Sequence, residues 1–288
     1  MMADSKLVTY LDSLAVWSPP ANTVQAILAD KGQYTHMLLA FWTQAGAVDV
    51  AKAWADPNTF PPDAIDSFHA AGIKVMVSAG GATETPITNN PNGGADYGRN
   101  AALFAKQHRL DGVDFDIEDT AAFLSGAATP WIVAAVQATK EAFPEAIISH
   151  APQAPYFMTT YASNYLQIEE QVGNLIDFYN IQFYNQGDTA YATYDSLFLQ
   201  ADGWASGTAI QQIHASGIPL EKIVVGKPVA PQDATNTGYV APDALAGFLQ
   251  QGIAADLRPA GVMGWQWLSD KTQWNGTWSD SVSAPFTR

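Results

Sequence analysis

The clearest indication of the architecture comes from residues 110–118, which read Leu-Asp-Gly-Val-Asp-Phe-Asp-Ile-Glu. Acidic and apolar residues alternate along this segment, and the two sets are Asp114, Asp116, Glu118 and Val113, Phe115, Ile117. Because successive side chains of a strand point to opposite faces, one face of this strand is apolar and the other carries carboxyl groups. We expect the apolar face to contact helices and the acidic face to point into a barrel.

Short apolar runs alternate with helix-like segments along the whole chain. The predicted strands are residues 6–11, 35–42, 73–79, 112–118, 147–151, 178–184, 223–227 and 261–267, and the predicted amphipathic helices include 97–108, 131–143, 207–215 and 243–252. Such alternation is typical of a parallel sheet. Eight units in 288 residues predict a single (β/α)8 TIM barrel domain over residues 1–288, with short loops and no inserted domain. A doubly wound open sheet is the competing fold, but no G-x-G-x-x-G follows the first strand.

Composition and charge exclude several classes of protein. The net charge of −15 disfavours nucleic acid and anionic membranes as partners. The absence of cysteine excludes thiolate nucleophiles, cysteine-ligated zinc and disulfide scaffolds. No run of 18 apolar residues is present, and the first residues lack the basic-then-apolar order of a signal peptide. The many aromatic residues, 9 Trp, 11 Tyr and 13 Phe, either fill a core or stack against sugar rings.

Three carboxyl groups on one inward face are difficult to ionise together. Neighbouring residues on one face of a strand lie roughly 7 Å apart, so at least one carboxyl pKa must rise. Glu118 is predicted at the carboxyl end of its strand, where barrel active sites lie, and a carboxyl group held protonated there is a general acid. Residues 83–94 are predicted to form the most conspicuous loop at the same end. Two alternatives remain: an edge strand with its acids in solvent, and a carboxylate ladder that binds Mg²⁺ or Ca²⁺.

The same acidic segment resembles a known family motif. Residues 111–118 are similar to the D-G-x-D-x-D-x-E signature of family 18 glycoside hydrolases, the chitinases and endo-β-N-acetylglucosaminidases. Other segments resemble that family in the same order: Ser78-Ala79-Gly80-Gly81, Ala151-Pro152-Gln153-Ala154-Pro155, Gln182-Phe183-Tyr184-Asn185, and Gly261-Val262-Met263-Gly264-Trp265 followed by Asp270. The second and third of these resemble plant and fungal class III chitinases, although the cysteine usual in the plant members is absent.

The resemblance implies a retaining hydrolase without a protein nucleophile. The acetamido carbonyl of the substrate attacks the anomeric carbon and forms an oxazolinium ion. Glu118 acts as general acid and then as base, while Asp116 accepts a hydrogen bond from the acetamide N–H. Asp114 shares a proton with Asp116, and Tyr184 donates its hydroxyl to the acetamide oxygen.

The resemblance also implies which residues bind sugar. Trp265 forms the floor of the site, Gln182 and Asn185 support the same sugar, and Gly80 and Gly81 let the backbone approach it closely. Two further tryptophans, Trp42 and Trp267, are expected in the core. The histidines lack the spacing of metal ligands and are predicted to be structural; they are His36, His69, His108, His150 and His214.

The predicted function is hydrolysis of β-1,4 bonds after N-acetylglucosamine, with a chitinase as the first choice. The alternatives are an endo-β-N-acetylglucosaminidase acting on the chitobiose core of N-glycans, and an inactive chitin- or glycan-binding lectin or inhibitor on the same fold. The expected partner is an oligo- or polysaccharide that contains N-acetylglucosamine. We expect a monomer without a metal or another cofactor. The family is often extracellular, but the sequence leaves the compartment open.

Overall fold

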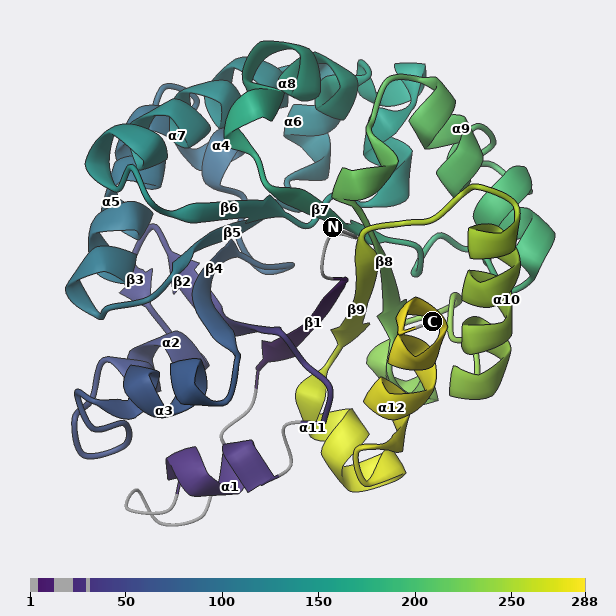
Figure 1. Ribbon diagram of the computed structural model, residues 1–288. Helices are drawn as coiled ribbons and strands as arrows, with labels where there is room; N and C mark the ends of the chain where they lie inside the picture. Colours follow the sequence, from purple (N-terminus) through teal and green to yellow (C-terminus); the bar gives the residue numbers. More distant parts are fainter. Residues whose placement is uncertain (1–4, 13–22, 30–31, 288) are drawn as a thin grey trace.

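The computed structural model describes residues 5–12, 23–29 and 32–287, in which parallel strands form a closed barrel surrounded by helices (Figure 1). The barrel strands are β1 (Lys6–Leu11), β2 (His36–Thr43), β4 (Lys74–Gly80), β5 (Gly112–Asp116), β6 (Ile147–His150), β7 (Phe178–Gln182), β8 (Ile223–Pro228) and β9 (Gly261–Trp265). β1 pairs with both β9 and β2, so the sheet closes on itself. The predicted TIM barrel is confirmed, and the open doubly wound sheet is excluded.

Several strands end earlier than the sequence suggests. Strands expected to reach residues 118, 184 and 267 end at Asp116, Gln182 and Trp265. Each of these residues is the last partner in a ladder with the neighbouring strand. Beyond these residues the backbone leaves the sheet and no longer pairs with the neighbouring strand. The apolar pattern in the sequence nevertheless continues for two residues. The carboxyl ends of the strands therefore carry short extensions at the mouth of the barrel.

One short strand was not predicted. β3 (Gly46–Ala47) pairs antiparallel with the end of β2. Two residues are too few to show a period, which is why the sequence pattern could not indicate this strand.

The helices around the barrel are α1 (Thr23–Ala29), α2 (Asp49–Trp54), α3 (Ala64–Ala70), α4 (Pro86–Asn89), α5 (Gly94–Gln107), α6 (Thr120–Ser125), α7 (Ala128–Ala142), α8 (Asn164–Val172), α9 (Ile210–Ala215), α10 (Pro242–Ala254), α11 (Trp267–Ser269) and α12 (Thr277–Ser283). The predicted helices correspond to α5, α7, α9 and α10. The predicted loop over residues 83–94 contains the short helix α4, which the sequence analysis did not predict. Pro86 occupies the first turn of α4, where its fixed φ favours a helix start.

The hydrophobic core has two layers, one on each face of the barrel strands. The outer layer lies between strands and helices and includes Val113, Phe115 and Ile117, as the alternation on β5 predicts. The inner layer fills the barrel and includes Tyr10, Met76 and other residues, namely Val8, Leu38, Ala151, Phe178, Tyr184, Val224 and Met263. β5 lies between β4 and β6, so the edge-strand alternative is wrong. Within the described chain, no helix combines the length and apolarity needed to cross a bilayer.

Candidate active site

A cleft of about 350 Å³ opens at the carboxyl ends of the strands. Its described lining residues are Tyr10, Asp12, Phe41, Asp49, Ala82, Thr83, Asp116, Glu118, Gln182, Tyr184, Asn185, Asp233, Thr235 and Trp265. Most of the side chains that the sequence singled out are therefore brought together here. Five of these described lining residues are Asp or Glu and none is Lys, Arg or His, so no basic side chain of the lining neutralises the acidic groups.

Asp114 lies below the cleft, fully buried in the barrel. One of its carboxyl oxygens, Oδ2, accepts hydrogen bonds from the hydroxyls of Tyr10 and Ser78, at 2.9 and 2.8 Å. The other, Oδ1, accepts from Ser149 Oγ at 2.6 Å and Asn180 Nδ2 at 3.2 Å. Burial raises the pKa of Asp114, while these donors oppose the shift. Asp114 thus ties together side chains from strands on both sides of it.

Asp116 and Glu118 are joined through one amide. Gln182 Nε2 donates to Asp116 Oδ1 at 3.0 Å and to Glu118 Oε1 at 3.4 Å. Glu118 Oε2 accepts a further bond of 2.9 Å from Gln153 Nε2. In the described part of the chain no hydrogen bond joins Asp114 to Asp116. No direct contact therefore supports the proton sharing between these two residues that the resemblance implies.

The electrostatics of the cleft favour protonated carboxyl groups. Burial raises the pKa of Asp116 well above its usual range, and the negative charges of Glu118 and Asp114 raise it further. Burial also raises the pKa of Glu118, although its hydrogen bonds from Gln153 and Gln182 act in the opposite direction. Because the two groups are close, a proton on either one stabilises the charge on the other. The pair can therefore hold a transferable proton at the mouth of the barrel.

Tyr184 follows β7 and lines the cleft with only 6% of its surface exposed. Its hydroxyl forms no hydrogen bond with another described residue. Burial and the negative charge of Asp116 raise the pKa of Tyr184 well above its usual range, so the hydroxyl remains a donor. A donor that lines the cleft beside the carboxyl pair, and has no partner among the described residues, is available to a ligand.

An aromatic wall faces these polar groups. The ring centroids of Trp265 and Tyr10 are 5.3 Å apart, and those of Trp265 and Phe41 are 6.2 Å apart with an interplanar angle of 24°. Trp265 is the last residue of β9 and remains partly exposed in the cleft. The other two tryptophans considered from sequence, Trp42 and Trp267, are buried in the outer core as expected. One tryptophan is thus presented to a ligand here.

The remaining predicted site residues support the walls of the cleft. Asn185 lines it with a positive φ of 60°, and its Oδ1 accepts a 2.8 Å hydrogen bond from the backbone N–H of Thr235. Gly80 and Gly81 lie behind the wall of the cleft, at the carboxyl end of β4. Gly80 has φ 121°, and a Cβ there would lie 2.1 Å from the carbonyl oxygen of Asp116, so only glycine allows β4 to turn this close to β5.

Sequence reasoning missed several cleft residues. These are Tyr10, Asp12, Phe41, Asp49, Ala82, Thr83, Asp233 and Thr235. Gln153, which holds Glu118, lies in the motif at residues 151–155, but the resemblance assigned it no role. Tyr10 stands near the end of a correctly predicted strand, which was the one available signal. The acids Asp12, Asp49 and Asp233 lie outside the strands, where no periodicity indicates a direction.

The histidines lie outside the cleft. Burial lowers the pKa of His150 to about 3 and that of His36 to about 4, so both rings are neutral. Among the described residues, no group of three or more His, Asp or Glu side chains is arranged to hold a metal ion. The described partners of Asp114, Asp116 and Glu118 are instead hydrogen-bond donors.

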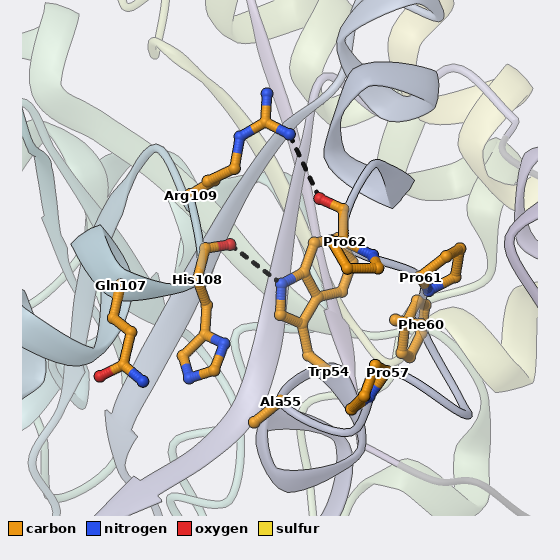
Figure 2. Close-up of a pocket in the computed structure, with 9 residues that line it drawn as sticks. All are labelled: Trp54, Ala55, Pro57, Phe60, Pro61, Pro62, Gln107, His108 and Arg109. Atoms are coloured by element: carbon orange, nitrogen blue, oxygen red, sulfur yellow. Dashed lines mark hydrogen bonds between the residues drawn. The ribbon is translucent and has the colours of Figure 1, made fainter.

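A second hollow of about 130 Å³ lies beside the amino-terminal end of β5. Figure 2 shows its lining residues, which are Trp54, Ala55, Pro57, Phe60, Pro61, Pro62, Gln107, His108 and Arg109. Trp54 Nε1 donates to the carbonyl oxygen of His108 at 3.3 Å, and Arg109 donates to the carbonyl oxygen of Pro62 at 3.2 Å. None of the lining residues that the structure describes is a carboxylate, so this hollow has no counterpart of the carboxyl pair in the cleft.

Comparison with known proteins agrees with this geometry. The model of the family described as glycosyl hydrolases family 18 matches residues 6–288. The chain is 29% identical over 269 residues to an acidic endochitinase of Cucumis sativus, covering 87% of this chain and 82% of the relative. It is also 29% identical over 272 residues to the acidic endochitinase SE2 of Beta vulgaris, covering 85% and 83%.

Solved structures share the fold. The structure of a GH18 chitinase from Pseudoalteromonas aurantia matches with a TM-score of 0.77 and 28% identity, covering 98% of this chain and 100% of that one. A structure titled putative chitinase A from Streptomyces coelicolor matches with a TM-score of 0.75 and 22% identity, covering 98% of each chain. Because the family model extends over nearly the whole barrel, this chain belongs to the family 18 glycosyl hydrolases.

Proposed function

We propose that this glycosidase cleaves the β-1,4 bond after an N-acetylglucosamine unit of chitin and retains the anomeric configuration. The observation that carries the proposal is the group formed by Glu118, Asp116 and Tyr184. Gln182 holds the two carboxyl groups together, and the Tyr184 hydroxyl lines the same cleft without a protein partner among the described residues. This arrangement supplies an acid, a charge-stabilising acceptor and a donor around one sugar.

In the first step Glu118 is the general acid. Its raised pKa keeps a proton available, and that proton passes to the glycosidic oxygen as the bond to the anomeric carbon breaks. The acetamido carbonyl oxygen of the same sugar forms the new bond to the anomeric carbon. The leaving group departs as a neutral alcohol, and the sugar becomes an oxazolinium ion.

Asp116 and Tyr184 orient the acetamide during this step. Asp116 accepts a hydrogen bond from the acetamide N–H, and its negative charge stabilises the positive charge that develops on the ring. Tyr184 donates its hydroxyl to the acetamide oxygen and holds that oxygen below the anomeric carbon. Asp114, with its four hydrogen-bond donors, anchors β5 beneath the pair.

In the second step Glu118 is a base. As a carboxylate it takes a proton from a water molecule whose oxygen bonds to the anomeric carbon from the leaving-group face. The oxazolinium ring opens and restores the acetamide. Because each displacement inverts the carbon once, the first product has the β configuration. NMR of the anomeric proton within minutes of mixing checks this, and an initial α-product would contradict the mechanism.

Sugar binding rests on Trp265 and its neighbours. The apolar face of the reacting sugar stacks on Trp265, which Tyr10 and Phe41 support at 5.3 and 6.2 Å. Asn185 and Gln182 border the same sugar. We assign chitin as the substrate because the relatives at 28 to 29% identity are named endochitinases and chitinases. Cleavage of the chitobiose core of N-glycans is the second candidate, because the family motifs are common to both activities.

The substrate assignment is tested by offering chitotetraose and a high-mannose glycopeptide in parallel. We expect cleavage of chitotetraose and little of the glycopeptide. Cleavage of the glycopeptide alone would establish the second candidate. Binding of chitotetraose without cleavage would show a lectin on this fold, although the presence of Glu118 argues against that outcome.

A further inference from the structure

A second buried carboxyl group directly follows the general acid in the sequence. Asp119 is only 1% exposed and is not among the described residues that line the cleft. It precedes α6, whose first residue is Thr120. A buried carboxyl group is costly unless protein donors satisfy its oxygens. The donors around Asp119 therefore show what this residue does beside Glu118.

Asp119 binds one residue of a neighbouring loop at two points. Its Oδ2 accepts a hydrogen bond of 2.7 Å from the backbone N–H of Thr88, and its Oδ1 accepts one of 2.7 Å from Thr88 Oγ1. Thr88 belongs to α4, which lies between β4 and α5 in the sequence. Two bonds to one residue fix the orientation of a carboxyl group as well as its distance. Asp119 thus joins the start of α6 to α4.

α4 is itself anchored to other parts of the barrel. Gln44 Nε2 donates to the carbonyl oxygen of Pro86 at 3.2 Å, and Trp131 Nε1 donates to the carbonyl oxygen of Asn90 at 3.0 Å. Pro86 is the first residue of α4 and Asn90 directly follows the helix, so both of its ends are held. The support that Asp119 contacts is therefore fixed independently of Asp119.

Asp119 also determines the direction in which the chain leaves Glu118. Its φ of −73° and ψ of 74° are those of an inverse γ-turn, in which the N–H of Thr120 donates to the carbonyl oxygen of Glu118 at 2.8 Å. Asp119 Oδ1 accepts a further bond of 3.4 Å from the N–H of Ala122. The ladder between β4 and β5 ends at Asp116, two residues before Glu118. The turn at Asp119 thus holds the backbone of Glu118 where pairing with β4 has ended.

The carboxyl group of Glu118 is supported from the opposite side. Gln153, which follows β6, donates to it at 2.9 Å, and Gln182 of β7 donates to it at 3.4 Å. β4 and β6 are the two neighbours of β5 in the sheet. The side chain of Glu118 is therefore held from the β6 side, while its backbone is held from the β4 side through Asp119 and Thr88.

We propose that Asp119 is a positioning residue, which keeps the carboxyl group of Glu118 within reach of the glycosidic oxygen by joining α6 to α4. The inference rests on the proposed function, because it requires Glu118 to be the general acid. Proton transfer needs its two heavy atoms about 2.6 to 3.2 Å apart. A misplacement of about 1 Å can lower the rate about 100-fold. Loss of the contact with Thr88 therefore slows proton transfer, although Asp119 itself does not line the cleft.

The test varies how strongly the leaving group needs a proton. Aryl di-N-acetylchitobiosides present the same two sugars with different phenols, and kcat/KM reports the step in which the glycosidic bond breaks. Phenol leaves slowly unless Glu118 protonates it, whereas p-nitrophenolate is stable as an anion. Asp119→Ala should lower kcat/KM about tenfold for the phenyl substrate and no more than about twofold for the p-nitrophenyl substrate, part of the roughly 100-fold that a general acid contributes. A merely structural role would lower both values by the same factor.

Milder variants test the same contact and remain informative if Asp119→Ala fails to fold. Thr88→Val removes the bond from Oγ1 but keeps the bond from the N–H, so it should show a smaller loss with the same dependence on the leaving group. Thr88→Ser keeps both bonds and should restore the lost activity. Asp63→Ala is the matched control, because Asp63 is exposed, precedes α3 and makes no capping bond with its side chain. It should change neither value of kcat/KM.

Glu118→Gln separates this inference from the proposed function. Its kcat/KM should depend more steeply on the leaving group than that of the wild type. If Glu118→Gln shows this dependence while Asp119→Ala and Thr88→Val lose nothing, or lose equally on both substrates, the positioning role is overturned and the proposed function stands. If Glu118→Gln leaves the dependence unchanged, Glu118 is not the general acid, and the proposed function fails together with the inference.

Discussion

At the scale of single residues, the proposed chemistry depends on two neighbouring carboxyl groups, Glu118 and Asp116, which the amide of Gln182 joins. Glu118→Gln keeps the hydrogen-bonding shape of the side chain but removes the titratable proton. We expect kcat for chitotetraose to fall at least about 100-fold, the usual worth of a general acid, with substrate binding retained. Steady-state rates and calorimetric titration measure the two quantities.

The exposed Glu145→Gln is the matched control and should leave both quantities unchanged. Normal turnover of Glu118→Gln would show that another group donates the proton.

The raised pKa of Asp116 also makes a residue-scale prediction about stability. Burial and the charges of Glu118 and Asp114 raise this pKa, so the folded state holds the proton more tightly than the unfolded state. The stability from that proton is complete below the unfolded pKa and is lost as pH rises through the folded pKa. Asp116→Asn removes this loss, so its advantage over the wild type should grow as pH rises from 4 to 8, by up to about 1.4 kcal/mol for each pH unit.

Thermal unfolding of both proteins across this pH range is the measurement. Asp63→Asn, at an exposed position on the surface, should follow the wild-type curve. A wild-type protein that gains stability over Asp116→Asn as pH rises would reverse the sign and contradict the raised pKa.

At the scale of secondary-structure elements, a lysine of β8 joins the loops around Tyr184 through hydrogen bonds. Lys227 is fully buried, and its Nζ donates to the carbonyl oxygens of Phe183, Tyr191 and Gly238 at 2.8, 2.8 and 2.9 Å. A Cβ on Gly238 would lie 2.4 Å from Tyr184, so these loops pack directly on the tyrosine. Lys227→Met leaves the carbonyl groups unpaired and should lower the free energy of unfolding by about 3 kcal/mol.

The same change should also lower kcat, because Tyr184 loses its support. Urea unfolding and chitotetraose hydrolysis measure the two effects, with the exposed Lys52→Met as the matched variant. If Lys227→Met and Lys52→Met have the same free energy of unfolding and the same kcat, the hydrogen bonds of Lys227 support neither the fold nor Tyr184.

At the scale of the whole molecule, we expect the reaction to need no bound metal ion. Acidic side chains converge on the cleft, yet no group of three or more described ligands is arranged around a cation. Full activity on chitotetraose should therefore remain after dialysis against EDTA. If EDTA abolished the activity and Mg²⁺ or Ca²⁺ restored it, Asp114, Asp116 and Glu118 would instead be identified as a metal site.

Part of the molecule is readable from local patterns alone. The alternation over residues 110–118 predicts which side chains of β5 face the helices, because a strand has a period of two whatever surrounds it. Repetition of strand and helix predicts the barrel, since each unit is recognised within a few residues. Strand ends were less well predicted: the pattern continues to Glu118, but pairing stops at Asp116.

The rest depends on barrel closure and register. Asp114 receives its donors from residues 35 to 104 positions away, on strands that only the closed sheet brings together. The bridge from Gln182 to both carboxyl groups, 66 and 64 positions away, has the same origin. Such contacts join residues far apart in the chain, so local sequence specifies the side chains while tertiary packing sets their distances.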